Sequence, residues 1–174
     1  IVDVIRDAFG YDHAQIFLMD EQNEYATLRA STGEAGRQLL EIRHRLKKGS
    51  SSVIGQVTAN QRMVVARAGS ADSPHRRNEF LPDTVVEAAF PLRIGDTIIG
   101  VLDLQSKETA IFEDEDTPIF QSLADHIAIA IDNARLFEAS EQQLRENQQL
   151  VEQTQRAAAE VDRLNQQLTR RFWD

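Results

Sequence analysis

Apolar and β-branched residues dominate two adjacent runs in the middle of the chain, Val86–Ile94 and Thr97–Gln105. The residues between them are Gly95 and Asp96, and a two-residue break that contains Gly is a strong signal for a tight β-hairpin. This turn predicts that Ile94 pairs with Thr97, Leu92 with Ile99, Phe90 with Val101 and Ala88 with Asp103. Both faces of the hairpin are largely apolar, so we expect other elements to cover both.

Residues that pair across two strands share a face of the sheet. The predicted register therefore places Phe90 and Leu92 on the same face as Val101, Asp103 and Gln105. The opposite face carries Gly100, Leu102 and Leu104. We expect Gly100 to allow a helix to approach this second face closely, because Gly has no side chain.

The flanking pattern predicts shorter elements. Apolar residues at helical spacing precede Gly10, which is suited to end a helix, and Ser52 is suited to begin one as its N-cap. Polar and turn-forming residues separate runs typical of strands. The predicted elements are helices at Ile1–Phe9, at Gly33–Arg45 and from Val53 to about Asn60, and strands at Ala14–Met19, Tyr25–Ala30 and Arg62–Arg67.

The C-terminal part of the chain predicts one long helix, since neither Gly nor Pro occurs from Ile119 to Phe172. A helix of this length would extend about 80 Å. Its beginning, Ile119–Phe137, is densely apolar, with one stripe at Ile119, Leu123, Ile127 and Ile131. Such a helix is buried on more than one side. We expect the sheet to cover one side and a second copy of the chain to cover the other.

From Ser140 onward the composition becomes polar, and apolar residues recur with a heptad spacing that predicts a coiled coil. One possible seam contains Asn147, Leu150, Val161 and Leu168, and a competing seam contains Leu144 and Val151. A buried Asn147 would set the register and the oligomeric state. We expect a homodimer through the terminal helices, with a candidate interface at Ala130, Ala134, Phe137, Leu144, Asn147, Val161 and Leu168.

Composition excludes several functions. The chain of 174 residues has no Cys, which rules out disulfides, zinc–thiolate sites and thiol catalysis. Most of the net charge of −9 lies in residues 113–174, which argues against nucleic acid as the main partner. No apolar run approaches the length of a transmembrane helix.

We therefore expect a cytoplasmic segment without membrane contact. Because the chain begins and ends within a pattern, we also expect it to be part of a longer protein.

Five stretches together resemble a GAF domain, and the likeness runs through residues 1–138 in the order of the family. The resemblance implies an α+β fold in which an antiparallel sheet carries terminal helices on one face. Loops and short helices cover a small-molecule pocket on the other face. The five stretches are Gly49–Val57, Met63–Val65, Phe90–Leu92, Ile98–Ser106 and Leu123–Leu136.

The resemblance implies a sensory module of signalling proteins such as histidine kinases. Residues 1–138 would be the sensor, and residues 139–174 the coiled-coil linker to an output domain beyond this chain. Members that bind bilins covalently or reduce free methionine sulfoxide use cysteines, so the absence of Cys excludes both roles. The motif of cyclic-nucleotide-binding members is matched only loosely, by Asn78, Phe80 and Asp83 at the wrong spacing.

The resemblance also places the face of Gln105 toward the pocket. Asp103 could bind a ligand there, or a backbone group or an Arg could satisfy it, since buried carboxylates need partners. His75 and Arg76 lie in the irregular stretch Ala68–Pro82, which should border the pocket and could hold an anion. The candidate ligand contacts are Phe90, Leu92, Val101, Asp103, Gln105, His75 and Arg76.

We expect an input domain that binds an unknown small molecule non-covalently and signals through a dimeric coiled coil. The alternatives are a ligand-free dimerisation or spacer module and, with less support, an enzyme of the same fold. No nucleophile–base arrangement, phosphate loop or carboxylate pair stands out, and the four His residues show no metal spacing. We therefore expect no catalytic residues, no metal and no cofactor.

Overall fold

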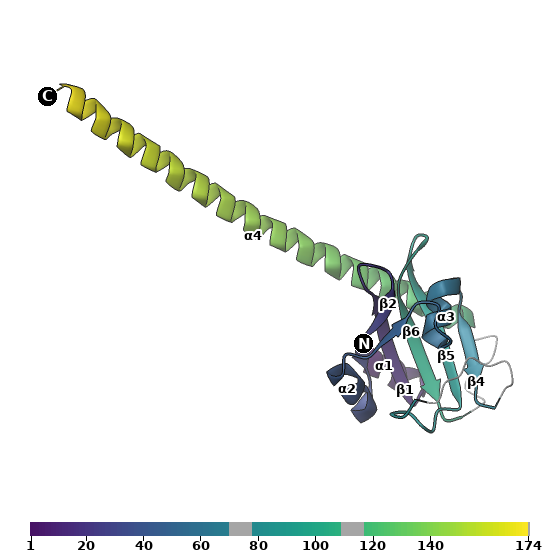
Figure 1. The fold of residues 1–174 in the computed structure, drawn as a ribbon. Coiled ribbons are helices and arrows are strands. Elements are labelled where there is room, and N and C mark those ends of the chain that lie inside the picture. Colours follow the sequence, from purple (N-terminus) through teal and green to yellow (C-terminus); the bar gives the residue numbers. More distant parts are fainter. Residues whose placement is uncertain (70–77, 109–116, 174) are drawn as a thin grey trace. The chain divides into compact units, whose positions relative to one another are not determined.

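The computed structural model describes residues 1–69, 78–108 and 117–173, with side chains as far as residue 167 (Figure 1). The chain divides into two compact units, Ile1–Ala130 and Ile131–Asp174. The first unit contains the sheet and the short helices. Helix α4, Thr117–Trp173, begins in the first unit and forms the second.

A six-stranded sheet forms the centre of the first unit, in the order β3-β2-β1-β6-β5-β4, and all neighbouring strands are antiparallel (Figure 1). This confirms the predicted α+β fold. Strand β3, which was not predicted, lies in the basic segment before Lys48 and occupies one edge. The strands are β1 His13–Met19, β2 Tyr25–Ser31, β3 Arg45–Lys47, β4 Val64–Arg67, β5 Val86–Ile94 and β6 Thr97–Ser106.

The first and third helices begin and end where local signals predict, whereas the second ends before the predicted Arg45, which lies in β3. Helix α1, Val2–Phe9, ends at Gly10, whose φ of 72° is the left-handed conformation of a helix C-cap. Helix α2 spans Gly33–Glu41. Helix α3, Val53–Asn60, begins after Ser52, whose hydroxyl accepts a 3.0 Å hydrogen bond from the Gly55 amide.

The central hairpin turns at Gly95-Asp96 as predicted, with Ile94 opposite Thr97. A β-bulge follows, because Arg93 pairs with Ile98 but Leu92 pairs with Gly100. Every later pair is therefore shifted by one residue. The predicted pairs of Phe90 with Val101 and of Ala88 with Asp103 are wrong; Leu102 lies opposite Phe90, and Ala89 lies opposite Asp103.

Because side chains alternate between the two faces of a strand, this shift moves Phe90 and Leu92 to the face opposite Asp103. The Phe90 ring packs against Phe120 of α4 with a centroid distance of 5.7 Å. Phe120 also makes edge contacts with Phe9 at 5.0 Å and Tyr11 at 5.5 Å. Aromatic rings thus join α1, the start of α4 and the sheet on this face.

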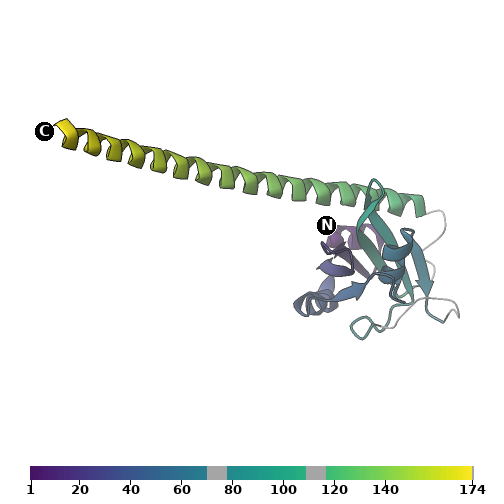
Figure 2. The ribbon, with the colours of Figure 1, turned by 45° about the horizontal axis from the view of Figure 1, so that its top comes forward.

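The buried stripe at the start of α4 consists of Phe120, Ala124, Ile127 and Ala128. Ile119, which was predicted to be part of the stripe, is 56% exposed. The buried residues still recur at helical spacing. The side of the helix that is buried is the one on which Phe120 contacts the aromatic rings of the sheet face. Helix α3 covers the other face of the sheet, as the two views in Figures 1 and 2 show.

Beneath α3, a second apolar core contains Phe17, Val53, Val57, Ala89 and Val101. Its strand residues come from β1, β5 and β6. This core fixes α3 on the face that carries Asp103. The sheet is thus covered on both faces, as the apolar character of the hairpin predicted.

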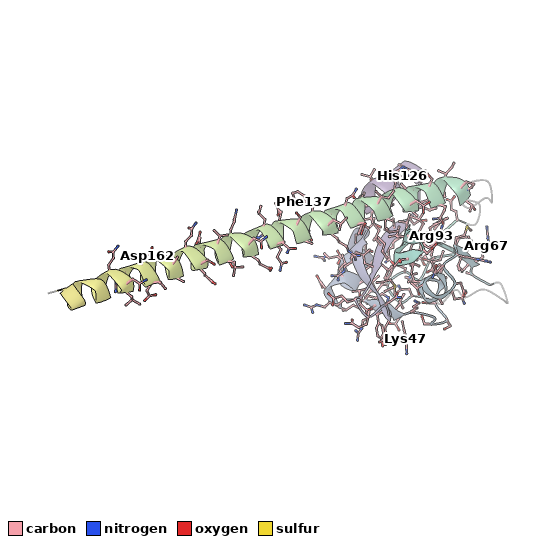
Figure 3. All side chains as sticks on the ribbon, turned by 90° about the horizontal axis from the view of Figure 1, so that it is seen from above. Lys47, Arg67, Arg93, His126, Phe137 and Asp162 are labelled. Atoms are coloured by element: carbon pink, nitrogen blue, oxygen red, sulfur yellow. The ribbon has the colours of Figure 1, made fainter. Side chains whose placement is uncertain are left out.

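The second unit consists of α4 from Ile131 onward. All its described side chains from residue 133 to residue 167 are exposed, and Phe137 and Asp162 are labelled in Figure 3. The predicted interface residues Ala134, Leu144, Asn147 and Val161 are among them; the side chain of Leu168 lies outside the described residues. In the first unit, Ala130 is also exposed. Exposure in a single chain leaves the predicted dimer untested. Within the described ranges, no helix combines the length and apolar character needed to cross a membrane.

Candidate functional site

A cavity of ≈ 540 Å³ opens on the face of the sheet that α3 covers. Apolar side chains from β1, α2 and α3 form part of its wall, among them Phe17, Leu39, Val53 and Ile54. Polar side chains from β1, β5 and β6 form its floor. The cavity therefore combines an apolar wall with a small number of polar groups, as small-molecule sites do.

Two adjacent rows of cross-strand neighbours build the polar floor. In one row, Gln15 of β1 lies opposite Asp103 of β6, which lies opposite Ala89 of β5. In the next row, Gln105 lies between His13 and Glu87. Antiparallel pairing places neighbours in a row about 5 Å apart.

A chain of hydrogen bonds orients the floor. The Thr84 hydroxyl donates to Gln105 Oε1 at 2.8 Å, and Gln105 Nε2 donates to Asp103 Oδ2 at 2.8 Å. Asp103 is 0% exposed, and within the described part of the chain no donor reaches its Oδ1 atom. One oxygen of a fully buried carboxyl group at the cavity floor thus lacks a donor.

Glu87 places a second carboxyl group on the face of Asp103, in the neighbouring row. Burial raises the pKa of Asp103 well above its ordinary value, and the negative charge of Glu87 raises this pKa further. The hydrogen bond from Gln105 acts in the opposite direction but does not offset the burial. The Asp103 carboxyl group therefore holds its proton more readily than an exposed carboxyl group does.

His13 lies beside this floor in a network of hydroxyl and amide groups. Its Nδ1 atom is 3.0 Å from the Thr32 hydroxyl, and its Nε2 atom is 3.0 Å from the Ser31 hydroxyl and 2.9 Å from Gln15 Nε2. Burial, with a smaller contribution from the charge of Arg6, lowers the pKa of His13 to about 4. The imidazole is therefore neutral at pH 7.

This low pKa predicts a specific loss of stability in mild acid. In the unfolded chain His13 takes up a proton near pH 6.5, but in the folded chain only near pH 4. Its contribution to the free energy of unfolding is fully present above pH 6.5. It falls by about 3 kcal/mol as the pH decreases to 4.

Urea unfolding at a series of pH values measures this loss. We expect His13→Gln to remove most of the decrease in stability between pH 6.5 and pH 4. The matched control is His126→Gln, because His126 is exposed on α4. A His13→Gln variant that loses stability with pH as steeply as the original chain would contradict the prediction.

Basic side chains stand at a different part of the cavity lining. Arg45 and Lys47 of β3 are both exposed, and the Arg45 guanidinium lies 4.5 Å from the centre of the Tyr25 ring. Figure 3 shows Lys47 and His126 on opposite sides of the first unit. The cavity thus has a buried acidic floor and two exposed basic side chains where β3 lines it.

The structure separates the residues that the sequence nominated as ligand contacts. Asp103 and Gln105 line the cavity, whereas Val101 packs in the core under α3. Phe90 and Leu92 lie on the opposite face of the sheet, because the bulge shifts their register. His75 and Arg76 lie outside the described residues. A role in ligand binding for Asp103 and Gln105 stays a prediction.

Sequence reasoning missed several cavity residues, of which Glu87, Gln15 and Thr84 matter most. A Glu within the apolar run of β5 and a Gln within that of β1 were available signals, since polar residues in buried strands are uncommon. The predicted register, however, placed Glu87 on the face opposite Asp103. The carboxyl pair was therefore not recognised.

Comparisons with known proteins agree with this fold. Residues 1–132 match the family described as GAF domain. A comparison with curated proteins found no match. Ninety chains of solved structures match this chain.

The GAF domain of a phosphoenolpyruvate-protein phosphotransferase from Coxiella burnetii is 25% identical, with a TM-score of 0.68, covering 79% of this chain and 82% of that one. The free methionine-R-sulfoxide reductase from Neisseria meningitidis, solved with its substrate, is 25% identical to this chain, with a TM-score of 0.63. The match covers 78% of this chain and 75% of the reductase chain. The GAF domain of a two-component sensor histidine kinase from Bacillus halodurans has a similar fold, with 15% identity and a TM-score of 0.59. The match covers 78% of this chain and 95% of the kinase GAF chain. Because the family match spans most of its residues, the chain belongs to the GAF domain family.

Proposed function

We propose that this chain is the input domain of a signalling protein and binds a small molecule non-covalently in the cavity on the α3-covered face of the sheet. One observation carries the proposal: the fully buried Asp103, whose Oδ1 atom has no donor in the described part of the chain, stands at the floor of this cavity. Members of the family commonly serve as signalling or ligand-binding modules.

Energetics support a binding role for this carboxyl group. A buried polar atom without a partner costs about 1–3 kcal/mol, and more if the group is charged. An apolar residue at position 103 would avoid that cost. A ligand that supplies the missing donor would recover it on binding. The cavity volume of ≈ 540 Å³ lies within the range of about 300–1,000 Å³ that is common for small-molecule sites.

A catalytic role has less support. The similar reductase acts on free methionine-R-sulfoxide, but a chain without Cys has no thiol for such a reduction. Among the described residues, no group of three or more His, Asp or Glu side chains could hold a metal ion. Binding without chemical conversion is therefore the better proposal.

The proposed signal passes through dimeric helices to an output domain such as a histidine kinase. Exposed apolar residues in the second unit, including Leu144, Val151 and Val161, recur at the spacing of a coiled-coil seam. A ligand can shift two packings of such helices only if it binds one of them more tightly. A monomeric chain in light scattering at micromolar concentration would contradict this mechanism.

Mass spectrometry of the small molecules released on denaturation tests the binding proposal. We expect protein purified directly from cells to release one compound in near-stoichiometric amount. Leu81→Trp should abolish the release, because partly buried Leu81 lines the cavity and an indole would fill it. The matched control is Ile42→Trp, since Ile42 is 59% exposed and is not part of the lining. Equal release from the two variants would contradict binding in this cavity.

A further inference from the structure

The structure also indicates which chemical class this cavity accepts. We infer that the ligand is a small organic amine whose ammonium group binds at the Asp103–Glu87 pair and whose apolar body lies along the wall formed by β1, α2 and α3. This inference rests on the proposed function, since it names the ligand class for the same cavity.

First, the floor offers acceptors and few donors. Asp103 Oδ2 is occupied by Gln105 Nε2, whereas Oδ1 receives no hydrogen bond within the described residues. Glu87, 8% exposed, supplies a second carboxyl group on the same face. An ammonium group carries three N–H donors and no acceptor. Its hydrogen-bonding capacity therefore complements this pair.

Second, a cation satisfies the pair better than a neutral donor does. Two adjacent buried carboxyl groups repel each other when both are ionised, and burial raises the pKa of Asp103. Without a ligand, protonation of Asp103 removes this repulsion. An ammonium ion can take the place of that proton and offset the negative charge of the carboxylates, whereas a hydroxyl group carries no charge that could do so. Hydrogen bonds between ionised partners are also about twice as strong as neutral ones.

Third, the rest of the lining fixes the orientation of the ligand. Phe17, Leu39 and Ile54 offer an apolar wall next to the floor. The exposed Arg45 and Lys47 disfavour an ammonium group at the β3 side of the lining. An amine therefore enters with its charged end toward Asp103 and its apolar part against the wall.

Three probes of similar size and shape test the inference: 2-phenylethylamine, 2-phenylethanol and phenylacetate, which are cationic, neutral and anionic at pH 7. Titrations of the whole chain, followed by ¹H–¹⁵N NMR, report the amides of Gln15, Glu87, Asp103 and Gln105. We expect the amine to shift these signals with a dissociation constant at least about tenfold below that of the alcohol. Phenylacetate should bind more weakly than the amine.

Substitutions of Asp103 and Glu87 test whether these two carboxyl groups cause the preference for the amine over the alcohol. Asp103→Asn should abolish the preference for the amine over the alcohol, and Glu87→Gln should reduce it independently if the first variant folds poorly. Glu41→Gln is the matched control, because Glu41 is an exposed carboxyl residue of α2 outside the cavity lining and should leave the preference unchanged.

The possible failures are distinguishable. Equal or tighter binding of the alcohol or phenylacetate at the same amides would overturn the amine inference and leave the cavity as a binding site. Amine preference that persists in both Asp103→Asn and Glu87→Gln would also overturn it. If none of the three probes shifts the cavity amides, the amine inference fails. If the purified protein also releases no compound, the proposed function fails with it.

Discussion

Replacing Phe120 with alanine is expected to lower the free energy of unfolding of the first unit by about 3–5 kcal/mol. Phe120 is only 4% exposed, and its ring contacts Phe9, Tyr11 and Phe90. Alanine would leave a void among these three rings and would remove the main aromatic contact between α4 and the sheet. Urea unfolding followed by the NMR signals of the sheet residues measures the loss.

Phe137→Ala is the matched control, because it makes the same chemical change in the same helix at a side chain that is 65% exposed. We expect it to change the stability of the first unit by less than about 1 kcal/mol. Equal losses in the two variants would show that burial of the Phe120 ring is not what stabilises this face. A loss for Phe120→Ala below about 1 kcal/mol would also contradict the prediction.

Gly100→Ala should be the most damaging single-methyl addition in the sheet. A Cβ atom at this position would lie 2.2 Å from the backbone oxygen of Phe17 and 2.8 Å from Leu18 Cδ2. Strands β1 and β6 would have to separate at the centre of the sheet. We expect a loss of about 3 kcal/mol or more in the free energy of unfolding, measured by urea unfolding. The sequence predicted that Gly100 accommodates the long helix, but these closest neighbours belong to strands.

A double variant shows which neighbour of the added methyl group causes the loss of stability. Leu18→Ala removes the flexible side chain near Gly100 but leaves the Phe17 carbonyl in place. The losses from Gly100→Ala alone and in the Leu18→Ala background should therefore be similar. If Leu18→Ala largely restored the stability of Gly100→Ala, a side-chain contact rather than the strand backbone would be the cause.

Local patterns predicted most of the elements, because their signals are carried by a few neighbouring residues. Gly10 ends α1, Ser52 begins α3 and Gly95-Asp96 forms the hairpin turn. The absence of Gly and Pro predicted one helix over most of α4. Strand β3 was missed because it is three residues long and has no apolar alternation, so its pairing with β2 defines it.

The candidate site could be predicted only in part. Asp103 and Gln105 were nominated because they are polar residues in an otherwise apolar strand, and both line the cavity. Phe90 and Leu92 were nominated with them through the register of an unbroken hairpin. The bulge beside Leu92 places both on the other face, and it brings Glu87 to the face of Asp103 instead.

The sequence by itself determined the order of the elements other than β3, the hairpin turn, the GAF resemblance and the exclusion of thiol chemistry. These features depend on backbone preferences of single residues, on short periodicities and on composition. Only the tertiary structure decided which side of the hairpin meets the cavity and which meets the aromatic cluster of Phe120. The physical reason is that one extra residue in a strand reverses its alternation, and the packing of both faces selects where that residue lies.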